Sequence, residues 1–260
     1  MSPQQLERLR QLTDGVESAE AERCQALLSR TMADSPVPDT ILVGMERLTH
    51  AVSDRAQFFK QLAASPRTVE ILSKLFVGSP YLTDILLRDP SLLNQLTSSQ
   101  TLGEMRSRPE FFESALERAA SAESFKDQMT ALRQFQQGEL LRIGVCDFLG
   151  LLDLRSVTNQ LSLLADAIVQ SALSFVLSDS VNDEPSEIAV LALGKLGGEE
   201  LNYSSDVDLV FVCVGDAARW TEVVQQLTKS LSEVSSHGLL YRVDLRLRPW
   251  GSAGPLVIPS

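Results

Sequence analysis

Asp206 and Asp208 are the residues best suited to chemistry in this sequence, because two carboxylates stand two positions apart beside an apolar run. The run is S-D-V-D-L-V-F-V, and it follows a glycine-rich stretch, G-K-L-G-G, and an earlier apolar run, A-V-L-A-L. Side chains alternate along a strand, so the two carboxylates should share one face. Paired carboxylates on one face can bind a metal ion.

A third carboxylate, Asp244, lies in L-L-Y-R-V-D-L-R-L-R-P, which alternates as a strand over 239–247. Three like charges cannot gather without neutralisation, so divalent cations are implied, and hard oxygen ligands select Mg²⁺ or Mn²⁺. Two such ions suit in-line displacement at phosphorus. The polar face of this expected strand also carries Leu240, Arg242, Arg246 and Arg248.

The glycine-rich turn predicts a phosphate-binding site. Glycines let backbone N–H groups approach a polyphosphate, and a short helix after the turn would point its N-terminus at the anion. Arginines of the third strand could bind phosphate in bidentate fashion. The residues expected to bind nucleotide or phosphate are Gly194, Lys195, Gly197, Gly198, Ser204, Ser205, Arg246 and Arg248.

Each of these signals is modest alone. A single D-x-D is common, a glycine cluster after a strand is more often only a turn, and alternating arginines can form a solvated sheet face. The three signals are more specific together, in this order. They resemble the pattern of the DNA polymerase β nucleotidyltransferase superfamily, in which a glycine motif precedes D-x-D by about ten residues. Here ten residues separate Lys195 from Asp206.

The preceding chain predicts a mainly helical scaffold as far as about Leu177, with apolar residues three and four apart. Serine or aspartate before proline should cap short helices at 67–77, 81–88 and 91–97. The polar segment 177–187 is the expected domain boundary. Strands at 188–193 and 207–214, a helix capped by Asp216 and the third strand follow. The predicted fold is α+β, with a helical region at 1–180 and a small mixed-sheet nucleotidyltransferase domain at 181–260.

Composition excludes several classes of protein. A formal charge of −11 argues against a nucleic-acid partner. The polar N-terminus and the lack of a run of about 20 apolar residues predict no signal peptide and no membrane span, and hence a cytoplasmic protein. Cys24, Cys146 and Cys213 lie far apart and are expected to be buried, reduced thiols.

Two segments, G-K-L-G-G-E-E-L-N-Y-S-S-D-V-D-L-V-F and Y-R-V-D-L-R-L-R-P-W-G-S-A-G-P-L-V, closely resemble the glutamine synthetase adenylyltransferase family. The resemblance extends upstream through L-F-V-G-S-P-Y-L-T-D-I-L-L-R-D-P-S-L-L and L-R-Q-F-Q-Q-G-E-L-L-R-I-G-V-C-D-F-L-G-L, and only the first 60 or so residues are less clear. It implies metal ligation by Asp206, Asp208 and Asp244, ATP or ADP and phosphate as substrates or products, and glutamine synthetase as partner. Binding of a PII-type signalling protein is left open.

That family has two similar halves, and N-Y-S-S-D with G-S-A-G-P-L-V looks more like the N-terminal, adenylyl-removing half. The resemblance therefore implies phosphorolysis of the AMP–tyrosine bond to give ADP. ATP-dependent adenylylation and a non-catalytic module that binds nucleotide or glutamine synthetase are the alternatives. Because the chain stops at Ser260, before the helices that follow in the family, we expect an excised fragment or a shortened protein.

Overall fold

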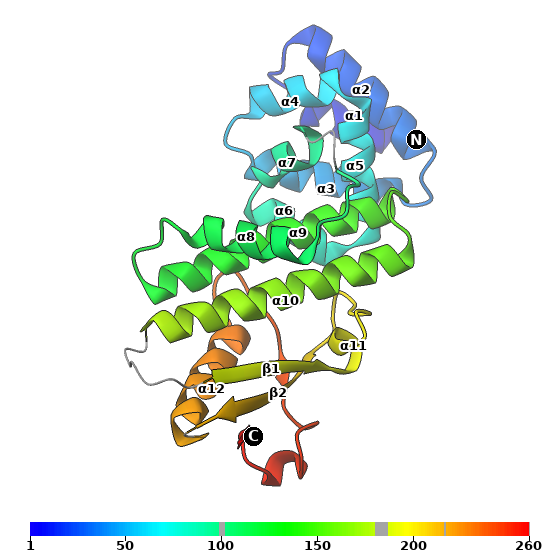
Figure 1. Cartoon of the computed structure of the whole chain (residues 1–260). Helices are drawn as coiled ribbons and strands as arrows, with labels where there is room; N and C mark the ends of the chain where they lie inside the picture. The colour runs from blue at the N-terminus through cyan, green and yellow to red at the C-terminus, as the bar shows by residue number, and fades with distance from the viewer. Residues whose placement is uncertain (99–101, 180–186, 216, 260) are drawn as a thin grey trace. The chain divides into compact units, whose positions relative to one another are not determined.

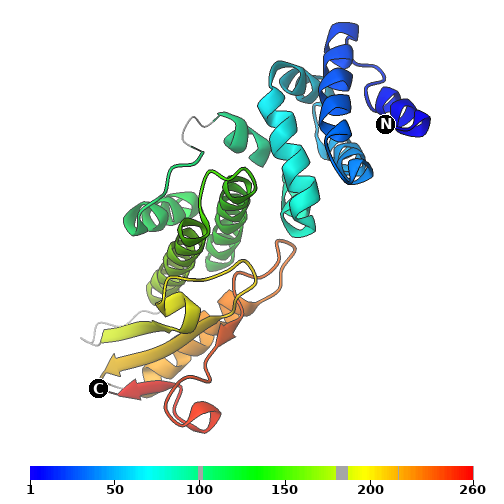
Figure 2. The ribbon, with the colours of Figure 1, turned by 90° about the vertical axis from the view of Figure 1, so that its right-hand side faces the viewer.

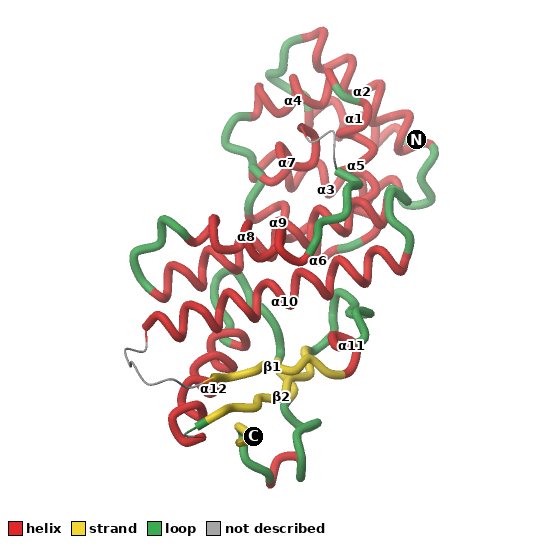
Figure 3. Tube along the Cα trace, viewed as in Figure 1, coloured by secondary structure: helices red, strands yellow, loops and turns green. Residues whose placement is uncertain are grey.

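A computed structural model describes residues 1–98, 102–179, 187–215 and 217–259 (Figure 1). The chain forms two compact units, one of Met1–Gly103 with Leu141–Leu152 and one of Glu104–Leu140 with Asp153–Ser260. The strands, yellow in Figure 3, all lie within residues of the second unit. The predicted boundary at 180/181 falls among residues 180–186, outside the described part of the chain, and stays a prediction.

The first unit is built from short helices, two of which, α5 and α6, begin at predicted serine–proline pairs. The Ser65 and Ser79 hydroxyls each accept a hydrogen bond, at 3.2 Å, from the backbone N–H three residues on, which satisfies an otherwise unpaired donor at the helix start. Its helices are α1 (Pro3–Leu12), α2 (Ser18–Ala33), α3 (Pro38–Ala51), α4 (Arg55–Ala64), α5 (Pro66–Gly78), α6 (Pro80–Arg88), α7 (Leu92–Ser98) and the end of α9 (Phe125–Phe148).

The three cysteines are buried and unbonded to one another, and burial raises the pKa of the Cys24 thiol to about 11. Because the thiolate is the reactive species, we expect all three thiols to resist Ellman's reagent at pH 8 in the folded chain. In denaturant, all three thiols should react, with three equivalents of thionitrobenzoate released per chain. Rapid reaction of one equivalent without denaturant would contradict the burial of these thiols.

The second unit combines helices with a four-stranded sheet. Its helices are α8 (Arg108–Ala119), most of α9, α10 (Leu154–Asp179), α11 (Gly194–Gly197) and α12 (Ala217–Ser232), with a short 3₁₀ turn η1 at Gly251–Ala253. The helix after the second strand was predicted, whereas its expected cap, Asp216, lies outside the described residues. These elements confirm the α+β class.

Strand β2 (Val207–Val214) is the centre of the sheet. β1 (Glu187–Leu193) pairs with it antiparallel, and β3 (Val243–Asp244) and β4 (Val257–Pro259) pair with it in parallel. Helix α12 packs against β2, β3 and β4, as Figure 2 shows from the side. Alternate residues of β2 fill the interface and are buried, namely Val207, Leu209, Phe211 and Cys213.

The third strand is much shorter than predicted. Over the expected span 239–247, only Val243 and Asp244 pair as strand. Before them, the N–H groups of Leu240 and Tyr241 both donate to the Leu231 carbonyl at the end of α12, at 3.1 and 3.0 Å. After them, the Arg246 N–H donates to the Asp244 carboxylate and the chain turns. Helix-end and turn hydrogen bonds therefore replace the ladder that the alternation suggested.

Helix α10 is long and rich in apolar residues. By length and composition alone, its segment Leu154–Ser178 could cross a membrane, with a mean hydropathy of 1.7 in its most apolar window, so the expectation that no stretch is long and apolar enough does not hold for it. However, 67% of its most apolar window is buried inside the structure, and it packs against α8 and α12 of the same unit. This burial is what the core helix of a globular unit shows.

Candidate active site

Asp208 and Asp244 face each other across two parallel strands. Asp208 is the second residue of β2 and pairs with Asp244 of β3. Asp206 immediately precedes β2. The Asp244 side chain is 14% exposed, and that of Asp206 is 45% exposed. The structure thus brings together the three carboxylates that the sequence singled out.

The charges of these carboxylates act on one another. The pKa of Asp208 is raised, first because burial disfavours its charged form and then because Asp244 and Asp206 repel a further negative charge. Arg246 opposes this rise. A site that gathers negative charge in this way favours binding of a cation.

Two arginines already neutralise part of that charge. Arg242 Nε lies 2.5 Å from Asp206 Oδ1, and its Nη2 donates to the Ser204 carbonyl at 3.0 Å. Arg246 binds both oxygens of Asp244, with Nη2 to Oδ2 at 2.5 Å and Nε to Oδ1 at 3.0 Å. The Arg246 side-chain and backbone hydrogen bonds lower the pKa of Asp244 to about 2. Of the three carboxylates, Asp208 alone makes no hydrogen bond or ion pair with an arginine among the described residues, although the charge of Arg246 still acts on it.

The donor set has the chemistry of a magnesium site, since it consists of hard carboxylate oxygens on neighbouring strands. Within the described residues, no group of three or more His, Cys, Asp or Glu side chains is placed so that it could hold a metal ion directly. The arginines occupy carboxylate oxygens that a cation would need. Their side chains are 65% exposed for Arg242 and 82% for Arg246, so both have room to move away.

The glycine turn lies directly against Asp208. Leu193, the last residue of β1, pairs with Asp208, and Gly194 follows with a φ of +54°. A Cβ atom at Gly194 would lie 2.3 Å from Asp208 Oδ2, and one at Gly197 would lie 2.5 Å from the Ala192 carbonyl oxygen. Close packing therefore requires both glycines, and it places the backbone of the turn next to the carboxylates.

Of the other residues predicted to contact phosphate, one is an exposed lysine and the rest take part in hydrogen bonds of local turns. Lys195 is exposed, and its ammonium makes no hydrogen bond or ion pair with a described residue. Ser205 donates to Asn202 Oδ1 at 2.8 Å, and the Ser204 N–H donates to the same oxygen at 3.1 Å, so both serines belong to a turn that leads into Asp206. Gly198 donates its N–H to the Gly194 carbonyl. Phosphate binding by these residues stays a prediction.

Arg248 braces the loop that follows β3. Its guanidinium donates to the carbonyls of Leu245, Ser252 and Gly254, at 2.6, 3.3 and 3.4 Å. These contacts fold the loop on itself and leave Trp250 80% exposed. Arg246 lies at the carboxylates, whereas Arg248 is engaged by the loop, so only the first is placed beside Asp244.

The sequence reasoning missed the residues that anchor the glycine turn. Glu199 has a φ of +54°, uncommon for a residue with a Cβ atom. Its carboxylate accepts from Arg108 at 2.9 Å and from Asn159 at 2.8 Å, and Arg108 also pairs with Asp166. The partners lie on α8 and α10, 91 and 40 positions away, so no local spacing could reveal them.

Loss of this anchor should loosen the turn. Arg108→Ala is expected to lower catalytic activity about tenfold while changing the free energy of unfolding by about 1 kcal/mol or less, since the Arg108 side chain is half exposed. Activity and thermal unfolding would be measured together. Arg47→Ala, which breaks a similarly exposed pair with Asp84 in the first unit, is the matched control. Equal activity of the two variants would refute the anchoring role.

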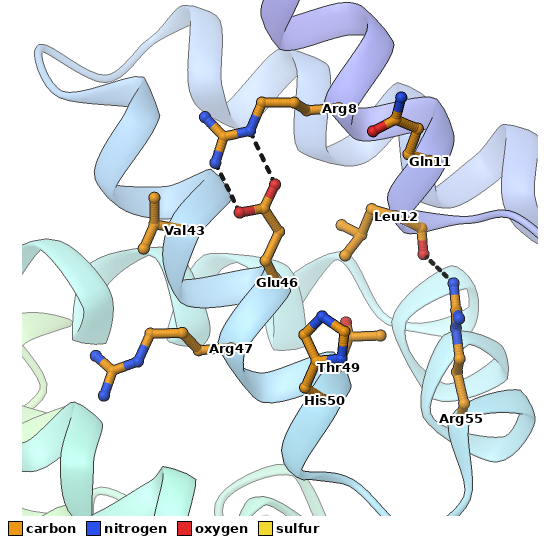
Figure 4. Close-up of a pocket in the computed structure, with 9 residues that line it drawn as sticks. All are labelled: Arg8, Gln11, Leu12, Val43, Glu46, Arg47, Thr49, His50 and Arg55. Carbon is orange, nitrogen blue, oxygen red and sulfur yellow. Dashed lines mark hydrogen bonds and ion pairs between the residues drawn. The ribbon is translucent and has the colours of Figure 1, made fainter.

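A separate cavity of about 410 Å³ lies in the first unit between α1, α3 and α4 (Figure 4). Arg8 binds both oxygens of Glu46 there, at 2.9 and 2.6 Å, and Arg55 donates to the Leu12 carbonyl at 2.7 Å. No residue predicted from the sequence as a site residue lines this cavity. The cavity therefore adds nothing to the candidate active site, which consists of the carboxylates and the glycine turn.

A profile of the glutamate-ammonia ligase adenylyltransferase family matches residues 69–260, well over half of the chain. The chain belongs to this family. The family is one of nucleotidyltransferases, which are enzymes, and the match spans the glycine turn and all three carboxylates.

Three curated proteins similar to this family member are each named bifunctional glutamine synthetase adenylyltransferase/adenylyl-removing enzyme. The protein from Thioalkalivibrio sulfidiphilus is 30% identical over 91% of this chain and 27% of its own length. Those from Chromobacterium violaceum and Mycobacterium tuberculosis are each 32% identical, over 88% and 93% of this chain and 26% of their own lengths. The chain thus spans about a quarter of these relatives.

Proposed function

We propose that this chain carries the nucleotidyltransferase centre of an adenylyl-removing enzyme that acts on glutamine synthetase. The observation that carries the proposal is the convergence of Asp206, Asp208 and Asp244 beside a glycine turn whose backbone packs on Asp208. The printed names of the relatives supply the protein substrate. The likeness of N-Y-S-S-D and G-S-A-G-P-L-V to the N-terminal half of the family supports removal over addition.

In this reaction an oxygen of orthophosphate bonds to the phosphorus of the tyrosine-bound AMP as the bond from that phosphorus to the tyrosine oxygen breaks. The tyrosine oxygen takes up a proton, and ADP leaves. Asp206, Asp208 and Asp244 would hold Mg²⁺ or Mn²⁺, which stabilises negative charge on the reacting phosphoryl oxygens. The backbone of the glycine turn and Lys195 would bind the nucleotide phosphates.

Arg246 would serve the incoming phosphate. Its side chain is 82% exposed and its guanidinium binds Asp244, so it can exchange carboxylate oxygens for phosphate oxygens by a short movement. A planar guanidinium binds either group in the same bidentate way. Arg246 would thereby hold orthophosphate next to the carboxylates before the bond forms.

ATP-dependent adenylylation of glutamine synthetase is the second candidate, because the relatives' name includes it and the same groups would stabilise the same phosphorus centre. The two reactions differ in their nucleotide. With adenylylated glutamine synthetase, orthophosphate and Mg²⁺, the proposal predicts formation of ADP together with unmodified tyrosine. Incorporation of label from ATP into unmodified glutamine synthetase, without ADP release in the first assay, would favour adenylylation instead.

A non-catalytic binding module gives a third pattern of results. Calorimetry with Mg-ADP or with glutamine synthetase would then show saturable binding, while neither assay yields a product. Binding together with ADP formation supports the proposal. Binding without any turnover would overturn it for this chain. A PII-type signalling protein as a regulatory partner and a cytoplasmic location belong to the same proposal.

A further inference from the structure

The segment that leads from α12 into β3 is held by buried polar side chains of α9. Gln136 and Gln137 are 3% and 7% exposed, and each donates its amide N–H to a carbonyl of this segment. Gln136 Nε2 lies 2.6 Å from the Leu240 oxygen, and Gln137 Nε2 lies 2.5 Å from the His237 oxygen. All of these residues belong to the second unit.

Three successive carbonyls just before β3 are each fixed by a different element. Leu240 accepts from Gln136 of α9, Tyr241 from the Ser232 hydroxyl of α12 at 3.1 Å, and Arg242 from the Val207 N–H of β2 at 2.9 Å. The next residues are the pairs Val207–Val243 and Asp208–Asp244. The contacts therefore run without a break from α9 to the carboxylates.

β3 cannot set its own register firmly, because it contributes only two residue pairs to the sheet. A slip of one residue in a strand would turn the Asp244 side chain to the opposite face. The carbonyl contacts at 240–242 prevent this slip. Of these contacts, only that of Gln136 comes from α9. Its loss would remove the amide that donates to the buried Leu240 carbonyl.

Gln137 offers a comparison within the same helix. Its carbonyl partner, His237, lies in the tight turn at 235–238, where Ser235 and Gly238 already exchange two backbone hydrogen bonds of 3.0 Å. That turn is separated from β3 by the clamped residues 240–242. Loss of the Gln137 contact should weaken the fold as much as loss of the Gln136 contact, without changing the register of β3.

We propose that Gln136 is a positioning residue, which holds Asp244 opposite Asp208 through the Leu240 carbonyl. The catalytic consequence rests on the proposed function, whereas the structural consequence does not. Methionine is the appropriate substitution, because it keeps the length of the side chain and removes the amide. Gln137→Met removes an equally buried amide one position along and is the matched control.

The first test is hydrogen exchange in the full chain, followed by NMR. The Val207 N–H bonds to the Arg242 carbonyl, so its exchange reports whether the segment before β3 stays docked. Gln136→Met is expected to speed exchange at Val207 about tenfold, the equilibrium effect of one lost hydrogen bond, without comparable change in the β1–β2 ladder. Gln137→Met should leave Val207 unchanged. Equal effects of the two variants at Val207 would overturn the proposal.

The second test is the kinetic effect in the ADP-release assay at a temperature where both variants are folded. Gln136→Met should lower kcat about tenfold and raise the Mg²⁺ concentration needed for half-maximal rate, with KM for glutamine synthetase unchanged; Gln137→Met should match the wild type. Wild-type kinetics in Gln136→Met would refute its positioning role. If the wild-type chain releases no ADP, the proposed function fails, but the exchange result still decides the role of Gln136.

Discussion

Asp208→Asn is expected to reduce the rate of ADP release about 100- to 1000-fold, the loss typical of removing one preorganised electrostatic group from an active site. The substitution keeps the shape of the side chain and removes one of three negative charges that act on one another. It also relieves repulsion among them, so the free energy of unfolding should not fall. Steady-state kinetics and thermal unfolding on the same preparation measure both effects.

Asp84→Asn is the control for this substitution, because it removes a carboxylate that pairs with Arg47 in the first unit. Its rate should equal that of the wild type. If Asp208→Asn retained the wild-type rate, the carboxylates would have no part in the chemistry, and the assignment of the active site would fall with them.

Gly194→Ala is expected to have the second large effect, because it adds an atom where none fits. The new Cβ would lie 2.3 Å from Asp208 Oδ2, in a backbone conformation with φ of +54° that disfavours any side chain. Either the turn or the carboxylate must move. We expect a loss of about 1–2 kcal/mol in unfolding free energy from the left-handed backbone, and a fall in rate comparable with that of Asp208→Asn.

Gly15→Ala separates backbone strain from steric displacement. Gly15 has a φ of +76°, and a Cβ there would meet no atom within 4 Å. It should lower stability by a similar amount and leave the rate unchanged. If both alanine variants kept full activity, close packing of Gly194 on Asp208 would have no catalytic importance.

Much of the fold could be predicted from local sequence. Serine–proline pairs mark the starts of α5 and α6, because the serine hydroxyl and the preset proline φ both act within one turn. The apolar run of β2 was predicted at its observed bounds, since a buried central strand has a continuous apolar sequence. The predicted length of the third strand was wrong. The alternation over 239–247 could not reveal that the N–H groups of Leu240 and Tyr241 bond to the Leu231 carbonyl at the end of α12 instead of to a neighbouring strand.

The candidate site was predictable in its carboxylates and not in its supports. Asp206 and Asp208 stand out by their spacing of two, and Asp244 by its place in an alternating segment, and the structure places all three within electrostatic reach of one another. Their metal-binding role stays a prediction. Gln136 and Arg108 reach the site's segments from positions about 100 residues away, through contacts that only the folded chain creates. The role of Arg248 could not be predicted either. Its alternation with Arg246 suggested phosphate binding, whereas in the structure its guanidinium donates to carbonyls of its own loop.

We propose that the three carboxylates form one divalent-metal site, and calorimetric titration with Mn²⁺ tests this proposal directly. The full chain should bind Mn²⁺ saturably, and Mg²⁺ should compete. Asp208→Asn should weaken this binding at least about tenfold, because one charged oxygen ligand is lost. Unchanged Mn²⁺ affinity in a variant with Asp206, Asp208 and Asp244 all replaced by asparagine would show that these carboxylates do not bind the metal.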